Sequence, residues 1–210
     1  MQTEARKWET LPKGYQSPAL LVAPESLEKR LKILGAHKNH LEPLVRRLSR
    51  KISPSISRNK DFFKEFAEDI YIVSCGFKEF IDPIMAKYKI PSERIFANTF
   101  EFTRTGKING FDRDNDLAKP DGKIDQLKKM NLPGEIHMIG DGFSDYQTRA
   151  AGIADKFHAF TENIERENIL DKADHIAPSL DEILYKENLP MSISYPKNRI
   201  KVLLLEGIHE

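Results

Sequence analysis

Between residues 59 and 187, short apolar runs alternate with segments of helical periodicity. The runs predict strands at 70–74, 135–140, 155–160 and 173–178. The intervening segments predict helices at 59–69, 77–88, 123–130, 144–152, 162–169 and 179–187. One strand followed by one helix, repeated along a chain, is typical of an open, mainly parallel sheet with helices on its faces. The predicted fold class is therefore α/β, with a Rossmann-like, mainly parallel sheet.

The segments before and after this region have a different character. Residues 1–24 are polar and rich in proline, which predicts a poorly ordered arm. Apolar residues at helical spacing predict a partial helical cap over 25–55, divided into two helices by Gly35 and Pro43. We expect the α/β core to span 56–190, with strand, turn and strand over 93–111. Residues 191–210 read as a linker followed by the start of a second domain.

Composition narrows the classes of function. Lys and Arg number 33 and Asp and Glu number 32, so the chain lacks the broad basic field of a nucleic-acid-binding protein. No apolar run reaches the length of a membrane span, and the first 20 residues lack the apolar middle of a secretory signal. A single cysteine, Cys75, allows no internal disulfide. A cytoplasmic protein without nucleic-acid or membrane partners is the expectation.

Polar residues follow two of the predicted strands, where ligands of open α/β sheets bind. Ser74 ends the run IYIVS, and a hydroxyl beside free backbone N–H groups can bind an anion. Asp141 and Asp145 follow HMIG in HMIGDGFSD, and carboxylate oxygens suit Mg²⁺. Lys119 and Lys123 precede a predicted helix and could hold phosphate if the fold directs them to the same place.

Each of these residues also has a simpler interpretation. Ser74 could serve only as an N-cap, and from its segment alone this is the favoured reading. Asp145 could cap a helix while Asp141 occupies a turn, although two aspartates around a glycine-rich strand exit favour a metal. A loop lysine is usually solvated surface.

Taken in order, these motifs resemble the phosphoserine phosphatase branch of the haloacid dehalogenase superfamily. VSCGF is similar to that branch's VSGGF, GDGFSD to its GDGxND, and the segment from FANTFEF to TGKINGF to its ANxF hairpin. SLEKR resembles the cap segment whose arginine, here Arg30, grips the substrate carboxylate. The likeness covers roughly residues 25–190 and implies a haloacid-dehalogenase-like fold.

The resemblance also implies roles for individual residues. Ser74 and Lys123 would hold the phosphate as catalytic residues, and Asp141 would bind Mg²⁺. Asp145 would be a metal ligand or an anchor behind one. Arg30, Cys75, Gly76 and Ser144 would line the substrate site. The implied ligand is a small phosphorylated metabolite of the phosphoserine type.

The family's nucleophile motif, an apolar strand ending in DxDx(T/S), does not occur before Arg30. The segment FDRDND, residues 111–116, contains the one DxD pattern but reads as a solvated loop. We therefore expect a fragment, inactive alone, of a longer phosphatase. Cys75 where the family has glycine, and Ser144 where it has asparagine, are smaller departures.

The tail SYPKNRIKVLLLEGIHE is similar to the junction at which bacterial phosphoserine phosphatases are fused to 3-phosphoglycerate dehydrogenase. Its apolar run, Lys201 to Leu205, has the character of the missing strand and could fill the central position of the sheet.

The leading interpretation is a phosphoserine phosphatase-like hydrolase of serine biosynthesis. The alternatives are a phosphatase for another small phosphomonoester, or a non-catalytic protein that binds Mg²⁺ and phosphate or provides an interface. The histidines show no ligand spacing with cysteine, so no zinc site is predicted. Residues 166–178 read as packing at a sheet edge.

Overall fold

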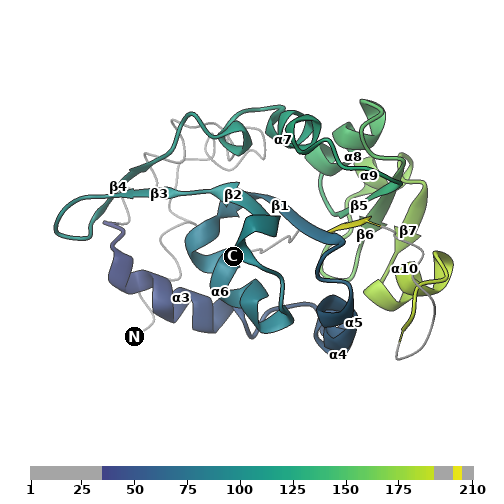
Figure 1. Ribbon diagram of the computed structural model, residues 1–210, viewed down its shortest axis with the longest axis horizontal. Coiled ribbons are helices and arrows are strands. Elements are labelled where there is room, and N and C mark those ends of the chain that lie inside the picture. The colour runs from purple at the N-terminus through teal and green to yellow at the C-terminus, as the bar shows by residue number, and fades with distance from the viewer. Residues whose placement is uncertain (1–34, 192–200, 205–210) are drawn as a thin grey trace.

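A computed structural model describes residues 35–191 and the backbone of 201–204 (Figure 1). Arg30 and the predicted 1–24 arm lie outside these residues, as does most of the 191–210 segment. The domain boundaries stay predictions. Among the described helices, none is both long and apolar enough to cross a membrane.

A six-stranded sheet in the order β2-β1-β8-β5-β6-β7 forms the centre of the molecule. All of its neighbouring strands run parallel. The predicted α/β class is confirmed. The strands are β1 (Ile70–Phe77), β2 (Ile95–Asn98), β5 (Ile136–Gly140), β6 (Lys156–Phe160), β7 (His175–Ala177) and β8 (Lys201–Leu204).

Helices cover both faces of this sheet, as Figure 1 shows. One face carries α4 (Pro54–Arg58), α5 (Lys60–Glu65), α6 (Lys78–Met85) and α10 (Leu180–Lys186). The other carries α7 (Gly122–Met130), α8 (Phe143–Ala150) and α9 (Glu167–Leu170). Successive strand residues point to opposite faces, so Ile72 and Ile139 pack beneath the first group of helices while Val73 and Met138 pack beneath the second. Burial on both faces explains why these strands read as continuous apolar runs.

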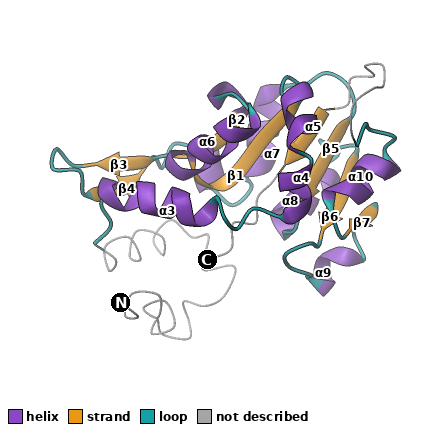
Figure 2. Ribbon diagram, turned by 90° about the horizontal axis from the view of Figure 1, so that it is seen from below, coloured by secondary structure: helices purple, strands orange, loops and turns teal. Residues whose placement is uncertain are grey.

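The strand-turn-strand predicted over 93–111 is split between two sheets. β2 joins the main sheet, whereas β3 (Phe100–Phe102) and β4 (Ile108–Phe111) form an antiparallel hairpin. The hairpin projects from one end of the molecule beside α3 (Leu41–Leu48), as Figure 2 shows. It is attached to the sheet through Phe77 of β1 and Phe100, whose rings stack with centroids 3.7 Å apart.

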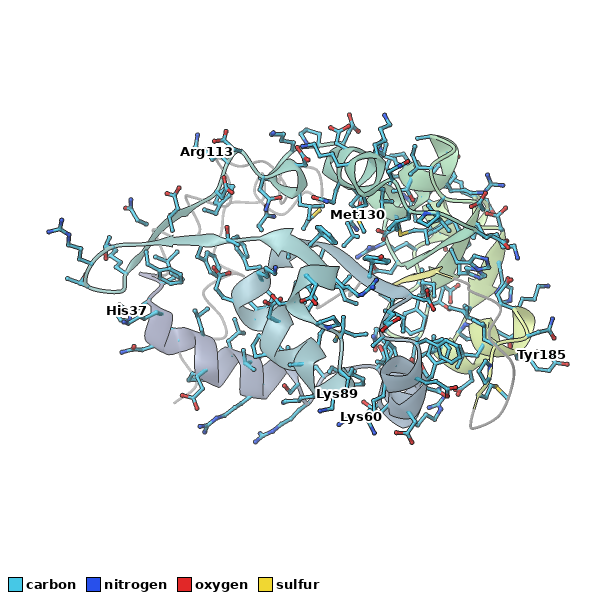
Figure 3. All side chains as sticks on the ribbon, in the orientation of Figure 1. His37, Lys60, Lys89, Arg113, Met130 and Tyr185 are labelled. Carbon is cyan, nitrogen blue, oxygen red and sulfur yellow. The ribbon has the colours of Figure 1, made fainter. Side chains whose placement is uncertain are left out.

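Residues 36–38 run along the hairpin, where His37 is labelled in Figure 3. The amide of Ile108 donates to the Ala36 carbonyl at 2.9 Å, and the amide of Lys38 donates to the Gly106 carbonyl at 2.8 Å. Short 3-10 turns occupy Lys38–His40, Ala86–Tyr88, Ser92–Arg94 and Asp116–Ala118.

Two local predictions were wrong. Pro43 does not break a helix, because it lies in the first turn of α3, where its missing N–H needs no partner. The helix predicted over 162–169 is reduced to α9. Glu162 accepts from the Ser55 amide at 2.9 Å and Asn163 donates to the Ser53 hydroxyl at 2.6 Å. These contacts hold the segment against the start of α4 in a non-helical conformation.

The tail strand β8 lies between β1 and β5. Val202 pairs with Ile70 of β1 and His137 of β5, and Leu204 pairs with Ile72 and Ile139. The predicted central position of the tail strand is thus confirmed for residues 201–204. This strand keeps β1 and β5, whose carboxyl ends carry the candidate site, one strand apart.

Candidate active site

The sheet register brings Ser74 and Asp141 to the same edge. Leu204 of β8 pairs with Ile72 on one side and Ile139 on the other. Ser74 and Asp141 each lie two positions beyond those partners. Ser74 lies in the second half of β1 and Asp141 directly follows β5, so both are on the carboxyl side of the parallel strands, where open α/β sheets bind ligands.

Ser74 belongs to β1 itself and does not cap a helix. The N-cap position of α6 is Phe77, which makes no side-chain capping bond. The Ser74 hydroxyl is buried and accepts from the Gly76 amide at 3.0 Å, which forms a tight turn. The simpler interpretation of Ser74 as an N-cap is wrong.

Asn98, at the end of β2, supports this turn from behind. Its side-chain amide donates to the Cys75 carbonyl at 2.8 Å and to the Leu117 carbonyl at 3.3 Å. Sequence reasoning did not single out Asn98, although it lies in the quoted segment FANTFEF. Cys75 itself is partly buried, and burial raises the pKa of its thiol, which favours the protonated form.

Of the two candidate lysines, only Lys123 reaches the site. It is buried at the start of α7, where its Nζ donates to the Asp145 carboxylate. Lys119 instead bonds to the Asp114 carbonyl at 3.0 Å, and half of its side chain is exposed. Gly122 allows α7 to begin there, since a Cβ would lie 2.0 Å from the Asp116 carbonyl oxygen.

Lys123 is charged although it is buried. Burial lowers its pKa, but the facing carboxylates of Asp145 and Asp141 and the Cys75 thiol outweigh that effect and raise the pKa above its usual value. A fixed positive charge at the strand ends is suited to an anionic ligand.

Asp145 is an anchor for this site. One carboxylate oxygen accepts from Lys123, and the other accepts from the Gly142 amide at 3.0 Å. Gly140 makes this arrangement possible, because a Cβ there would lie 2.3 Å from the Asp145 Oδ2. With both oxygens engaged and the side chain buried, Asp145 fits the anchoring role better than that of a direct metal ligand.

Asp141 is the carboxylate best placed to meet a ligand. Its side chain remains 14% exposed, with Oδ2 at 3.3 Å from Arg166 Nη1. Arg166 also donates to the Asp141 carbonyl at 3.1 Å. Sequence reasoning placed Arg166 in a packing segment and so missed this contact, and no spacing in the sequence indicates it. Ser144 is half-buried in the first turn of α8, next to this loop.

The FDRDND segment lies beside the start of α7, where the Asp116 backbone contacts Gly122, but its carboxylates are engaged elsewhere. The Asp112 carboxylate accepts from the Asp114 amide at 2.9 Å, and Asp116 pairs with Lys129. A nucleophile is therefore not supplied by this DxD pattern.

Sequence similarity to known proteins assigns this chain to a family. The chain is 30% identical to phosphoserine phosphatase from Bos taurus over 175 residues, which covers 82% of this chain and 72% of that protein. The chain belongs to the phosphoserine phosphatase family. It is also 31% identical over 153 residues to the chloroplastic phosphoserine phosphatase of Arabidopsis thaliana, of which it spans about half the length, 52%.

Solved structures agree with this family. A phosphoserine phosphohydrolase-like protein from Francisella tularensis superposes with a TM-score of 0.64 at 30% identity, over 78% of this chain and 76% of that one. The structure of DsGPDH of Dunaliella salina shares the fold, with a TM-score of 0.60 at 24% identity over 77% of this chain and 28% of that one. No protein-family model matches the chain. The predicted phosphoserine phosphatase-like fold and family are confirmed, whereas the likeness of the tail to a fused dehydrogenase stays a prediction.

Proposed function

We propose that this chain binds a small phosphomonoester of the phosphoserine type, together with Mg²⁺, at the carboxyl edge of β1 and β5. The observation that carries the proposal is the buried, positively charged Lys123, held by Asp145 at the same strand ends as Ser74 and Asp141. The names of the relatives support phosphoserine as the first ligand to test.

Each residue has a distinct role in this proposal. The Ser74 hydroxyl, which accepts from the Gly76 amide, donates its proton to a phosphate oxygen, and Lys123 neutralises the phosphate charge. Asp141 holds Mg²⁺, which commonly takes one or two protein carboxylates and completes its shell with water and phosphate oxygens. A bound Mg²⁺ would supply further charge neutralisation to the phosphate. Arg166 orients Asp141, and Asp145 keeps Lys123 in place.

Hydrolysis is a separate question from binding. The family's nucleophile motif DxDx(T/S) is not found in these 210 residues. Loss of a nucleophile costs many orders of magnitude in rate. The proposal is therefore binding of phosphomonoester without appreciable turnover by this chain. A cytoplasmic setting and a covalently joined dehydrogenase complete the proposed context.

Calorimetry can test the binding proposal with O-phosphoserine, serine and inorganic phosphate, each with and without Mg²⁺. Phosphoserine should bind in the presence of Mg²⁺, and serine should not. Lys123→Met should weaken phosphoserine binding by about 100-fold, because it removes a buried charge contact worth roughly 2–3 kcal/mol. Lys119→Met, which alters a neighbouring exposed lysine, should bind as the wild type does.

Equal loss of affinity in both lysine variants, or binding of serine as tight as that of phosphoserine, would refute this site. Phosphate release measured across small phosphomonoesters tests the second part. Mg²⁺-dependent hydrolysis at rates typical of an enzyme would show that the chain has a nucleophile outside the DxDx(T/S) pattern.

A further inference from the structure

Three metal-binding side chains meet on the α10 side of the sheet, at the opposite end of β5 from the candidate active site. His137 lies near the start of β5, His158 lies on β6, and Glu187 directly follows α10. Since Ile139 pairs with His158, both histidines point to the face that Ile139 occupies, where α10 packs. About four residues of extended chain, roughly 13 Å, separate His137 from Asp141.

Both histidines are fully buried, with 1% and 0% of their surface exposed. The Glu187 side chain is 9% exposed. Buried histidines and carboxylates of this kind are rare unless they are paired or bind a metal. The outer surface of α10, marked by Tyr185 in Figure 3, is in contrast open to solvent.

The spacing of the three groups suits one small cation. His137 Nδ1 and His158 Nε2 are 3.1 Å apart, and the Glu187 oxygens lie 3.8 Å from the first and 3.7 Å from the second. Zn²⁺ binds imidazole nitrogen and carboxylate oxygen at about 2.0–2.1 Å, so neighbouring ligand atoms of a tetrahedral site are roughly 3.3 Å apart. The 3.8 Å distance is to Glu187 Oε2 and the 3.7 Å distance is to Oε1, and one ligand atom from each residue lies within 4.8 Å of the other two. Rotation of the carboxylate and shifts of up to about 1.5 Å bring the three atoms to the tetrahedral spacing.

The neighbours of these groups support them as ligands. His137 Nε2 lies 3.1 Å from the Glu135 carboxylate, at ion-pair distance but without the geometry of a hydrogen bond. His158 Nδ1 lies 3.4 Å from His175 Nδ1, a position in which it can donate and leave Nε2 as a lone pair. Metal-bound histidines are commonly oriented by such outer partners.

Glu187 is likewise oriented from outside. Lys156 Nζ donates to its Oε2 at 2.6 Å, which leaves Oε1 facing His158. A hydrogen bond between the two imidazoles accounts for their mutual approach, and the ion pair with Lys156 accounts for the position of Glu187 Oε2. The carboxylate lies beyond hydrogen-bond distance of both rings, at 3.7 and 3.8 Å. A cation between the three groups would bind Oε1, the carboxylate oxygen that Lys156 does not hold.

We propose that His137, His158 and Glu187 form a binding site for a divalent transition-metal ion, with Zn²⁺ as the best match, that fastens the end of α10 to strands β5 and β6. Imidazole nitrogen favours Zn²⁺ and its neighbours in the first transition row over Mg²⁺. The site is structural, because it lies at the other end of β5 from the candidate active site. It is independent of the phosphate-binding proposal.

The histidine pattern in the sequence could not reveal this site. His137 and His158 are 21 residues apart along the chain, and His158 and Glu187 are 29 residues apart. Only the parallel alignment of β5 with β6 and the return of α10 bring them together. The sequence predicted no zinc site because no histidine stands at ligand spacing from a cysteine. This cluster contains no cysteine, so that criterion could not detect it.

The experiment titrates metal-free full-length protein with Zn²⁺ and, for spectroscopy, with Co²⁺. The wild type should bind one Zn²⁺ tightly, give the strong visible bands of tetrahedral Co²⁺, and melt about 5 °C higher with excess Zn²⁺. Glu187→Gln keeps the shape of the side chain and an oxygen for Lys156. It should lower Zn²⁺ affinity by at least tenfold and weaken the Co²⁺ bands.

Two variants control for surface binding. His37→Gln/His40→Gln removes a half-buried and an exposed histidine on the hairpin side, and Glu165→Gln removes an exposed carboxylate. Both should bind Zn²⁺ as the wild type does. Melting in EDTA shows whether each variant is folded before metal is added. Loss of Zn²⁺ binding in the His37/His40 variant, unchanged binding in Glu187→Gln, or only octahedral Co²⁺ bands would overturn the proposal.

Discussion

Lys123 and Asp145 depend on each other, because both are buried and each neutralises the other. Removal of one partner leaves an uncompensated charge away from water, which typically costs about 3–5 kcal/mol. Asp145 also accepts from the Gly142 amide, so its loss disturbs the loop that presents Asp141.

We predict that Asp145→Ala and Lys123→Met each lower the free energy of unfolding by about 3 kcal/mol, and that the double variant costs less than their sum. Urea denaturation of the four proteins gives the coupling energy directly. Arg46→Met with Glu42→Ala, an exposed pair on α3, is the matched control and should show little coupling. A coupling energy for Lys123 and Asp145 no larger than that of the control would contradict the buried pair.

In the metal-free protein, protonation of His158 makes the stability of the fold depend on pH. Burial, followed by repulsion from His137, lowers its pKa from 6.5 to about 4. Glu187 acts in the opposite direction, while His175 and Lys156 reinforce the lowering. A depressed histidine pKa means that the unfolded chain takes up the proton first. Stability is therefore complete above pH 6.5 and is lost as the pH falls towards 4.

We predict that His158 makes the metal-free protein about 3 kcal/mol less stable at pH 4 than at pH 7, since each unit of pKa difference corresponds to about 1.4 kcal/mol. Urea denaturation in EDTA between pH 7 and 4 measures this loss. His158→Gln should show a shallower pH dependence, and His37→Gln, on the hairpin side, should retain the wild-type dependence. Identical slopes in His158→Gln and the wild type would exclude this residue as the source.

The turn from β5 into α8 has no room for a side chain at Gly140. A Cβ on Gly140 would lie 2.3 Å from the Asp145 Oδ2 and 2.4 Å from its Cγ. The carboxylate cannot move aside without losing Lys123 and the Gly142 amide. Gly152, at the other end of α8, has a left-handed φ of +69° but open space around it.

Gly140→Ala should therefore lower stability by about 2–3 kcal/mol and abolish Mg²⁺-dependent phosphoserine binding. Gly152→Ala should cost only about 1 kcal/mol of backbone strain and leave binding intact. Denaturation and calorimetry on the two variants make the comparison. If the two substitutions had equal effects on binding, the close approach at Gly140 would not matter to the site.

At the same scale, the strands and most helices could be predicted from sequence. The apolar runs that became β1, β5 and β6 are largely buried on both faces, so their pattern was unambiguous, whereas β7 is a short edge strand with Ile176 exposed. The helix that contains α9 was predicted too long. Glu162 and Asn163 hold the preceding segment in a non-helical conformation through contacts with distant residues, which the local sequence does not indicate.

The residues of the candidate site that follow strands could be predicted from the sequence, but the residues that contact them were harder to predict. Ser74, Asp141 and Asp145 follow apolar runs, which marks them in the sequence. The family resemblance predicted Lys123, although the two lysines could not be told apart from the residues alone. The contact of Arg166 with Asp141 depends on how distant segments pack, which a linear pattern does not encode.

The whole molecule is held together by the order of its sheet. β8 separates β1 and β5, and it is the last described strand in the chain although it lies at the centre. Its backbone pairs on both sides, which satisfies the inner edges of two halves of the sheet. Without β8 those edges would be open to solvent or to other chains.

Truncation after Met191 removes β8 and should therefore lower the melting temperature by more than about 10 °C or cause aggregation, since two inner strand edges lose their partners. Removal of residues 205–210 alone leaves β8 in place and is the matched control. Leu203→Pro tests the same strand within the full-length chain, because proline cannot donate to the ladder at a central position. Thermal melting with light scattering measures all three proteins. The short deletion should melt close to the wild-type temperature. Leu203→Pro and the long deletion should both melt at much lower temperatures. A chain ending at Met191 that melts like the full-length protein would mean that β1 and β5 do not need the tail strand between them, and the central position of β8 would then be a minor contributor to the fold.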